Sequence, residues 1–367
     1  VNRLGKMNKA YKFRMYPNKE QEIILAKTFG CVRFIYNKML EDKIAYYEKT
    51  KEKLNNTPAQ YKAEYEWLKE VDSLALANAQ LNLQTAYNNF FRSPKVGFPR
   101  FKSRHKNHNS YTSNNQKGSI RIEGSKIKLP KIGFIKIKQH RQIPGHYILK
   151  SATVSRSPWG KYFVSILFEY ERIIKPVKPR NIVGLDFSMT ELFVSSEGEF
   201  ASYPRYYCQS LERLKRENRR LSQCQKESNN RNKQRIKVAR LHEKVANQRK
   251  DFLHKLSRKI TNSYDAVCIE DLNMQAMSKA LNFGKSVADN GWGMFVNQLS
   301  YKLTEAGKEL VKIDKWFPSS KTCSRCGAVK DTLSLSERVY KCDCGLVIDR
   351  DINAAINIKN QGKVLLA

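Results

Sequence analysis

Four acidic side chains stand where an apolar run ends or a helical run begins, and acids in such places can bind a hard metal ion. Asp186 closes IVGLDF, Glu270 lies at the end of AVCIED, and Asp349 and Asp351 precede INAAINI. Carboxylates suit Mg²⁺ or Mn²⁺, and two such ions about 3.5–4 Å apart can bracket the attacking and leaving oxygens of a phosphodiester. Each acid alone can also be a solvated strand end or a helix N-cap. The pattern therefore predicts a two-metal site, provided that the acids meet in space.

Four of the eight cysteines are clustered, and their spacing indicates a metal site. Two pairs stand fifteen residues apart, one separated by two residues and one by a single residue: Cys323, Cys326, Cys342 and Cys344. This is close to the CxxC…CxxC pattern of a zinc ribbon, and Gly327 and Gly345 permit a tight turn after each pair. Four protein ligands leave no open position, so we expect structural Zn²⁺. The single-residue gap narrows the second turn, and a metal-free group of buried thiols is the alternative.

The elements that must position these groups indicate an α/β domain. Apolar runs ending at Asp186 and Glu270 predict two buried strands, residues 311–317 predict a third, and residues 292–310 have the period of an amphipathic helix. Strands that alternate with helices are typical of an α/β fold. Residues 209–262 predict a long helical pair with 17 Lys or Arg against 5 Asp or Glu. An excess of this size favours contact with a phosphate backbone over a merely solvated face.

The N-terminal half predicts a small β-barrel or sandwich interrupted by helices. Residues 8–16 alternate as a strand and stop at Pro17, after which residues 17–92 have helical periods. Five short alternating runs follow, from SIRIEG to KYFVSILFEYE, with Gly and Pro between them. The strand at 8–16 can join these later strands, which leaves the helical bundle as an insertion.

Two groups in this half are candidate nucleic-acid contacts. The helix predicted over 73–91 carries Asn78 and Asn82 opposite its apolar face, and amides suit the major-groove edge of adenine. A plain solvated face explains these amides equally well. The basic, aromatic-interleaved segment 95–118 carries four cations that we expect to contact phosphates without reading sequence: Arg100, Lys102, Arg104 and Lys106.

The charge of the chain points to an anionic partner. It has 68 Lys and Arg against 34 Asp and Glu, a net charge of +34 over 367 residues. Self-repulsion of this size favours a protein that binds nucleic acid, because phosphate contacts supply most of the affinity of a basic surface. A membrane partner is not expected, since no run of about 18 apolar residues or signal-like segment is present.

Three motifs in this order resemble the TnpB proteins, RuvC-like proteins of bacterial insertion sequences that are related to type V CRISPR effectors. They are IVGLDFSMTELFVSSEGE, CIEDLN and CSRCG…CDCG…DRDINAAINI, and the opening segment and GFPRFKS extend the resemblance over essentially the whole chain. The resemblance implies an endonuclease that binds a guide RNA from the transposon end, recognises a short adjacent motif and cuts double-stranded DNA at one RuvC site. It implies that Asp186, Glu270 and Asp351 are the catalytic acids that bind Mg²⁺ or Mn²⁺. Asp349 is then expected to be a cap or a supporting acid.

The resemblance also implies a domain map and a location. We expect an α/β RuvC-like (RNase H-like) nuclease domain with an inserted zinc ribbon, and an N-terminal β-barrel of the wedge type that carries a helical-bundle insertion. The protein is expected in the bacterial cytoplasm, associated with the nucleoid. The expected boundaries are the first wedge strand 1–16, a helical recognition domain 17–94, the rest of the wedge barrel 95–178, a nuclease domain with a basic helical insertion 179–318, a zinc ribbon 319–345, and a nuclease C-terminal helix and tail 346–367.

Three alternatives remain at this point. An RNA-guided repressor that binds DNA without cleaving it would be expected to lack one acid of the triad, and this chain has all three. A guide-free RuvC-like nuclease would leave the helical insertion and the basic channel unexplained. A non-catalytic zinc-ribbon protein that binds RNA would make the placement of the acids accidental.

Overall fold

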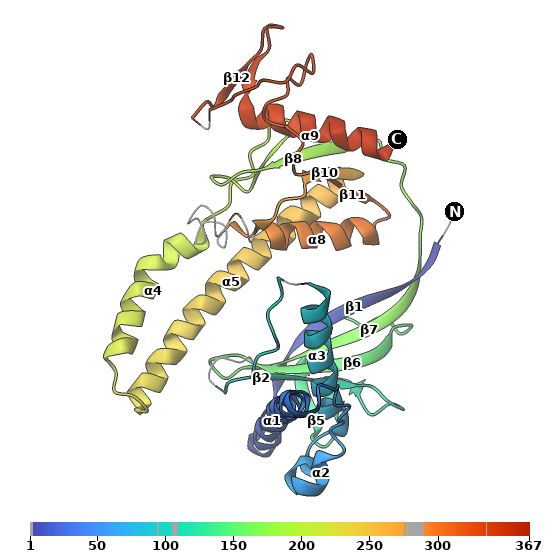
Figure 1. The fold of residues 1–367 in the computed structure, drawn as a ribbon, viewed down its shortest axis with the longest axis vertical. Coiled ribbons are helices and arrows are strands. Elements are labelled where there is room, and N and C mark those ends of the chain that lie inside the picture. Colours follow the sequence, from blue (N-terminus) through green and yellow to red (C-terminus); the bar gives the residue numbers. More distant parts are fainter. Residues whose placement is uncertain (1–2, 94, 105–108, 275–276, 278–289, 335) are drawn as a thin grey trace. The chain divides into compact units, whose positions relative to one another are not determined.

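The computed structural model describes residues 3–93, 95–104, 109–274, 277, 290–334 and 336–367. The chain forms two compact units, one over Gly5–Arg172 and one over Ile173–Ala367 together with residues 3–4 (Figure 1). Among the described residues, no helix is both long enough and apolar enough to cross a bilayer.

The first unit is built on a seven-stranded half-barrel sheet with the order β2-β6-β7-β1-β5-β4-β3. The first strand lies between β7 and β5, which confirms that the strand predicted at 8–16 joins the later ones. The strands are β1 (Arg3–Tyr16), β2 (Asn109–Asn114), β3 (Arg121–Glu123), β4 (Lys126–Leu129), β5 (Gly133–Lys138), β6 (Ile148–Arg156) and β7 (Tyr162–Ile174).

Strand β2 was not predicted, because its sequence NSYTSN lacks apolar alternation. It pairs with β6 along its whole length, and its inward positions are Tyr111 and Ser113. The Ser113 hydroxyl donates a hydrogen bond to Asp72, the N-cap of the third helix. A polar strand can therefore be buried where the tertiary structure satisfies its hydroxyls.

Helices fill the interval between β1 and β2, as expected. They are α1 (Lys19–Thr50), α2 (Tyr61–Glu64), a 3₁₀ turn (Glu66–Glu70) and α3 (Ser73–Arg92). Helix α1 begins at a capping box in which Asn18 and Gln21 exchange hydrogen bonds. Apolar residues of α1 and α3 share one core with the sheet, so the helices are part of the fold of this unit and not an appendage.

The second unit contains a four-stranded sheet with the order β11-β10-β8-β9. The strands are β8 (Ile182–Phe187), β9 (Phe193–Ser195), β10 (Ala266–Glu270) and β11 (Glu309–Ile313). Strands β8, β10 and β11 are parallel, and β9 returns antiparallel to β8. This confirms the predicted α/β arrangement.

Helices of this unit are α4 (Tyr206–Gln223), α5 (Asn229–Ser263), α8 (Trp292–Glu305) and α9 (Arg350–Leu366). Helices α5 and α8 share a core with Val183, Leu185, Val267 and Ile269, whereas α9 covers β8, β10 and β11 through Ile358 (Figure 1). Odd-numbered positions of β8 and β10 therefore face one helical layer, and even-numbered positions face the other. A small ladder of β12 (Val339–Lys341) and β13 (Val347–Asp349) precedes α9.

The predicted helix over 292–310 is too long. Helix α8 ends at Glu305, and a turn at Gly307, with φ of +71°, leads into β11, which begins at Glu309. The third strand consequently spans 309–313 and not 311–317. The sequence pattern missed this boundary because the apolar period of the helix continues across Gly307, from Leu299 and Leu303 to Leu310.

Candidate active site and metal centre

Asp186 and Glu270 lie at the carboxyl ends of neighbouring parallel strands. Leu185 of β8 pairs with Ile269 of β10, so the two acids occupy the next position on strands about 4.8 Å apart. Each acid stands two residues after a residue that contacts α9, namely Gly184 on β8 and Cys268 on β10. Alternate residues of a strand lie on the same face of the sheet. The acids are therefore expected on the α9 side of the sheet, with α5 and α8 packed on the opposite side.

Two glycine contacts place α9 close to this sheet. A Cβ on Gly184 would lie 2.1 Å from the carbonyl oxygen of Ala355, and a Cβ on Gly362 would lie 2.2 Å from the Sγ of Cys268. Only a hydrogen in place of each side chain permits these approaches. The helix is thereby fixed against β8 and β10 at two points, and its first turn carries Asp351.

Asp349 and Asp351 have different environments at the start of α9. The carboxylate of Asp349 accepts hydrogen bonds from the backbone nitrogens of Asp351 at 2.8 Å and Ile352 at 3.1 Å, which confirms the predicted cap. Asp351 is half-buried and forms ion pairs with Arg350 at 3.2 Å and Arg338 at 3.9 Å. Its carboxylate is therefore not used in capping.

Asp186 lies within electrostatic reach of Glu270 and Asp351. Burial raises the pKa of Asp186 well above its usual value, and the charges of Glu270 and Asp351 raise it further, whereas Arg350 and the Phe187 backbone N–H oppose the shift. Burial also raises the pKa of Glu270, while a hydrogen bond from Ser319 lowers it. Ionising Asp186 or Glu270 therefore places a negative charge where little water can solvate it.

A divalent cation fits this donor set. Carboxylate oxygens are the ligands that Mg²⁺ prefers, and the mutual repulsion of the acids is relieved by a bound cation. Asp186, Glu270 and Asp351 would hold such an ion. The three carboxylates are less tightly gathered than the cysteines, since the four sulfurs form the one group in the described residues whose ligand atoms lie within 4.8 Å of one another.

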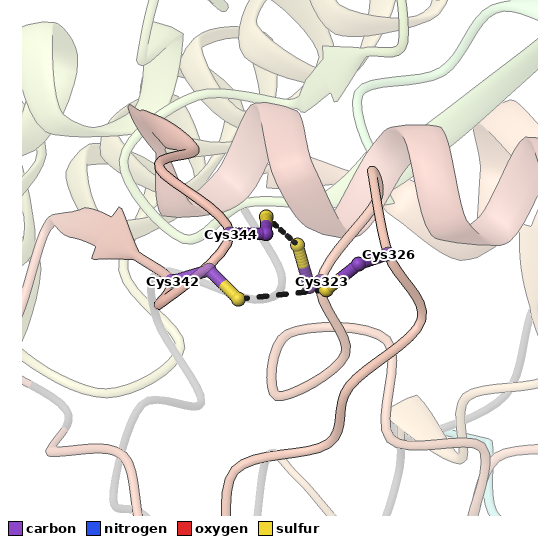
Figure 2. Close-up of side chains that lie close together, drawn as sticks. All are labelled: Cys323, Cys326, Cys342 and Cys344. Carbon is purple, nitrogen blue, oxygen red and sulfur yellow. Dashed lines mark hydrogen bonds between the residues drawn. The ribbon is translucent and has the colours of Figure 1, made fainter.

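The four cysteines meet as the spacing predicts. Figure 2 shows Cys323 and Cys326 of one loop facing Cys342 and Cys344 of another. The sulfur atoms of Cys323 and Cys344 lie 3.6 Å apart, as do those of Cys326 and Cys342. Zn–S bonds of about 2.3 Å would place tetrahedral sulfurs about 3.8 Å apart, so the group fits zinc. The short Cys342–Cys344 gap therefore does not prevent convergence.

The turns of this cluster favour a metal, and one of its thiols is acidic. Gly327 and Gly345 have φ of +79° and +85°, and their nitrogens donate to the carbonyls of Cys323 and Cys342, so both predicted tight turns are confirmed. Burial raises the pKa of the Cys323 thiol, but hydrogen bonds from the backbone N–H groups of Cys326 and Arg325 and from the neighbouring thiols outweigh it and bring the pKa to about 6. Backbone N–H groups oppose a rise in the pKa values of Cys342 and Cys344, but burial and neighbouring thiols raise both, that of Cys342 to about 12. Without a metal, the cluster therefore favours a thiolate at Cys323 and protonated thiols at Cys342 and Cys344. A thiolate is the form that binds a soft metal.

The amides predicted to contact nucleic acid lie beside one cavity of the first unit. Asn78 and Asn82 of α3 line a cavity of about 220 Å³ together with Lys102 and with Tyr111 and Thr112 of β2. Asn78 also donates to the carbonyl of Leu74, and Asn82 is exposed. The cavity is therefore lined both by the Asn-rich face of α3 and by strand β2.

The predicted basic contacts have unlike environments. The Lys102 ammonium lies 3.9 Å from the centre of the Tyr36 ring, and its backbone exchanges hydrogen bonds with Asn37. Burial lowers the pKa of Lys102. Arg100 and Arg104 are exposed, and Lys106 lies outside the described residues.

Sequence reasoning did not identify three polar residues that contact Glu270 or the loop of the first cysteine pair. Ser319 donates a hydrogen bond to Glu270, and Asn353 and Asn357 of α9 bind the loop that leads to Cys323. The two asparagines stand four apart in the otherwise apolar run INAAINI of this helix, which was the available signal. Ser319 carries no such signal, because its role depends on a contact with a strand 49 residues away.

Comparisons with known proteins found three family matches along the chain. Residues 7–52 match a family described as “Helix-turn-helix domain”, residues 165–281 match the OrfB family of IS605 described as “Probable transposase”, and residues 292–358 match “Cas12f1-like, TNB domain”. The last match covers the loops of the four cysteines and the start of α9.

Two curated relatives match nearly the whole chain. A protein of Streptomyces pristinaespiralis is 37% identical over 98% of this chain and 90% of its own length, and InsQ of Escherichia coli strain K12 is 32% identical over 98% and 93%. Both carry the name “Putative RNA-guided DNA endonuclease”.

A solved structure shares the fold. Cas12f1 in a complex with sgRNA and target DNA matches 97% of this chain and 99% of its own, with a TM-score of 0.64 and 16% identity. Sequence, family matches and fold agree, and the chain belongs to the TnpB family, the OrfB group of IS605 transposon proteins related to Cas12f.

Proposed function

We propose that this protein is an RNA-guided, metal-dependent DNA endonuclease. It binds a guide RNA derived from a transposon end, recognises a short motif adjacent to the target and cleaves double-stranded DNA at a single RuvC site. The names of its full-length relatives support the RNA-guided endonuclease class. The observation that carries the nuclease chemistry is the placement of Asp186 and Glu270 at adjacent strand ends, with Asp351 in electrostatic reach.

These acids are proposed to hold Mg²⁺ or Mn²⁺ at the scissile phosphate. Bound cations would supply the Lewis acid that activates water and stabilises the leaving oxygen. The chain itself contributes the carboxyl ends of two neighbouring parallel strands and a helix fixed at Gly184 and Gly362. Asp349 is the cap that keeps the first turn of α9 formed. A structural Zn²⁺ is proposed for the four cysteines.

The nucleic acids are proposed to lie along the basic surfaces. The α4–α5 hairpin, which contains the 209–262 segment of net charge +12, would follow a phosphate backbone. Asn78 and Asn82 would read the adjacent motif from the cavity that they line, with Lys102 beside them. Arg100 and Arg104 would contact phosphates, and the same contact remains a prediction for Lys106.

The units of the proposed endonuclease follow from the expected map. The half-barrel strands within 1–16 and 95–178 would serve as the wedge domain and the helices within 17–94 as the recognition domain. The segment 179–318, with the ribbon 319–345 and the helix that follows it, would form the nuclease lobe. A bacterial, nucleoid-associated location is proposed with this function.

One experiment tests the proposal against its competitors. The protein is expressed with the flanking transposon-end RNA and given Mg²⁺ and a matched plasmid whose adjacent motif is randomised. We expect guide-dependent double-strand cleavage of a subset of motifs, and no cleavage with Asp186→Ala. Cleavage without guide would refute the RNA-guided function in favour of a guide-free nuclease. Guide-dependent binding without cleavage would favour a repressor.

A further inference from the structure

A short chain of hydrogen bonds connects the candidate catalytic acid Glu270 to the loop of the first cysteine pair. The Ser319 hydroxyl donates to Oε1 of Glu270 at 2.5 Å. Ser319 stands four residues before Cys323 in the segment that enters the cysteine cluster. The hydroxyl therefore links a strand-end carboxylate to the loop that would carry zinc.

Helix α9 also binds this loop, through two asparagines. The Asn357 amide donates from Nδ2 to the carbonyls of Ser319 at 2.8 Å and Thr322 at 2.7 Å. The Asn353 amide donates from Nδ2 to the carbonyl of Thr322 at 2.7 Å and accepts from the Ser324 nitrogen at 3.0 Å. Ser319 is thus held by its carbonyl and holds Glu270 by its hydroxyl.

Burial makes this arrangement specific. Ser319, Asn353 and Asn357 are 6%, 0% and 4% exposed. A buried amide that loses its partners is destabilising, so the two asparagines have one well-defined set of contacts and not several. The helix that makes these contacts also carries Asp351 and is fixed to β8 at Gly184. The geometry of Glu270, Asp351 and the Cys323 loop therefore depends on one rigid helix.

We propose that Ser319 and Asn357 are positioning residues for the catalytic metal site, and that through them the cysteine cluster controls the position of the Glu270 carboxylate. This inference rests on the proposed function, because it assumes that Glu270 binds the divalent cation. The Ser319 hydroxyl fixes Oε1 and leaves the second carboxylate oxygen of Glu270 for the metal. Zinc closes the loop that begins at Ser319, and Asn357 anchors that loop to α9.

The proposal predicts a defect in binding of the divalent ion without a general loss of structure. In Ser319→Ala, the Glu270 carboxylate loses its only fixed side-chain donor among the hydrogen bonds of the described residues. We expect the Mg²⁺ concentration for half-maximal cleavage to rise about tenfold, because partners that orient a ligand are worth about that much in metal affinity. Cleavage at saturating Mg²⁺ should recover substantially, and zinc content should stay at one per chain.

The experiment uses the full chain bound to its guide RNA. Cleavage rates are measured over a range of Mg²⁺ concentrations, Mn²⁺ binding is measured directly by calorimetry, and zinc is measured by elemental analysis. Ser319→Thr keeps the hydroxyl and should bind Mn²⁺ nearly as the wild type does. Ser324→Ala is the matched control, because Ser324 contacts Asn353 through its backbone nitrogen, which the substitution retains.

The link to the cysteines is tested by a double-mutant cycle with Cys326→Ser, which removes one zinc ligand. If zinc acts through Ser319, then Cys326→Ser should weaken Mn²⁺ binding strongly in the wild-type background and much less in Ser319→Ala. Additive effects of the two substitutions would overturn the link. Asn357→Ala should weaken Mn²⁺ binding as Ser319→Ala does.

The remaining outcomes decide between the inference and the proposed function. Unchanged Mn²⁺ binding in Ser319→Ala, or equal losses in Ser319→Ala and Ser324→Ala, would overturn the positioning role. A parallel loss of zinc in Ser319→Ala would also overturn it, since it would indicate general collapse of the loop. A wild-type protein that binds Mn²⁺ but does not cleave DNA with its guide would instead refute the proposed function. The Mn²⁺ affinities of the variants would still show whether Ser319 and Asn357 position the metal site.

Discussion

At the residue scale, the two aspartates at the start of α9 have separate tasks. Asp349 accepts two backbone hydrogen bonds at the helix end, whereas Asp351 lies within electrostatic reach of Asp186. We expect Asp351→Ala to abolish guide-dependent cleavage while zinc is retained. Asp349→Ala should leave measurable cleavage, because it removes a cap worth about 1 kcal/mol. Cleavage rates and zinc content check this ranking, and the reverse order would contradict the assignment of the metal ligand to Asp351.

The raised pKa of Asp186 gives a stability prediction with a defined sign. Because burial and the neighbouring acids raise its folded-state pKa, protonated Asp186 contributes stability that is complete below the unfolded value and is lost as pH rises through the folded value. Asp186→Asn should therefore raise the melting temperature of the metal-free protein near pH 8, by about 2–4 °C for a gain of roughly 1 kcal/mol.

Thermal melts in a chelator for divalent ions, between pH 4 and pH 8, check this expectation. The difference between Asp186→Asn and the wild type should grow with pH. It should shrink when Mg²⁺ is added, because a bound cation stabilises the charged wild-type site and not the variant. A difference that does not change with pH would show that repulsion at Asp186 is not its cause.

The residues predicted from the sequence were those with local signals. The cysteine pairs and their glycines are defined by spacing, and Asp349 stands directly before a helical period, so each could be predicted without a fold. Ser319 and Arg338 could not, since their contacts with Glu270 and Asp351 depend on how distant segments pack. Sequence spacing predicts contacts between residues of one element. Contacts between residues of different elements can be identified only from the tertiary structure.

At the element scale, the packing of α9 on the sheet sets the site, and Gly184 makes that packing possible. A methyl group there would lie 2.1 Å from the Ala355 carbonyl oxygen, so the helix would have to move away from β8. We expect Gly184→Ala to destabilise the protein by about 2 kcal/mol or more and to impair cleavage. Chemical denaturation and cleavage assays measure both effects.

Gly293→Ala is the matched control in the same unit. Gly293 lies in helix α8, and a methyl group at this position would meet no atom within 4 Å. Alanine should therefore stabilise the protein by about 0.5–1 kcal/mol through helix propensity. Equal effects at Gly184 and Gly293 would show that the close approach of α9 to β8 does not limit stability.

The strength of the sequence pattern also explains which elements were predicted. Strong apolar periods predicted α1, α3 and the three parallel strands, and the expectation that β1 joins the later strands is confirmed. The strand β2 and the end of α8 were missed. In β2 the buried positions are a tyrosine and a serine, and between α8 and β11 only Gly307 marks the change of element. In β2, packing overrides the local pattern, whereas at Gly307 an apolar period that continues into β11 hid a local stop signal.

At the scale of the whole molecule, the charge of +34 must be balanced by nucleic acid if the proposed function is correct. Between Asp72 and Glu123 the sequence has no acidic residue, and exposed Arg100 lies in this interval. A cation that displaces counterions from a phosphate adds about 0.9 to the slope of log affinity against log salt. We expect Arg100→Ala to weaken guide RNA and target DNA binding uniformly across motifs and to reduce this slope by about one.

Lys27→Ala provides a control of equal charge change, because the Lys27 ammonium is paired with Glu70 at 2.6 Å. Its removal lowers the net charge by one unit without removing a free phosphate contact, so it should leave the slope nearly unchanged. Binding is measured by titration at several salt concentrations with matched and unmatched motifs. Equal slope changes for Arg100→Ala and Lys27→Ala would mean that overall charge, and not a contact at Arg100, governs affinity. A change in motif preference with Arg100→Ala would instead place that side chain at a base edge.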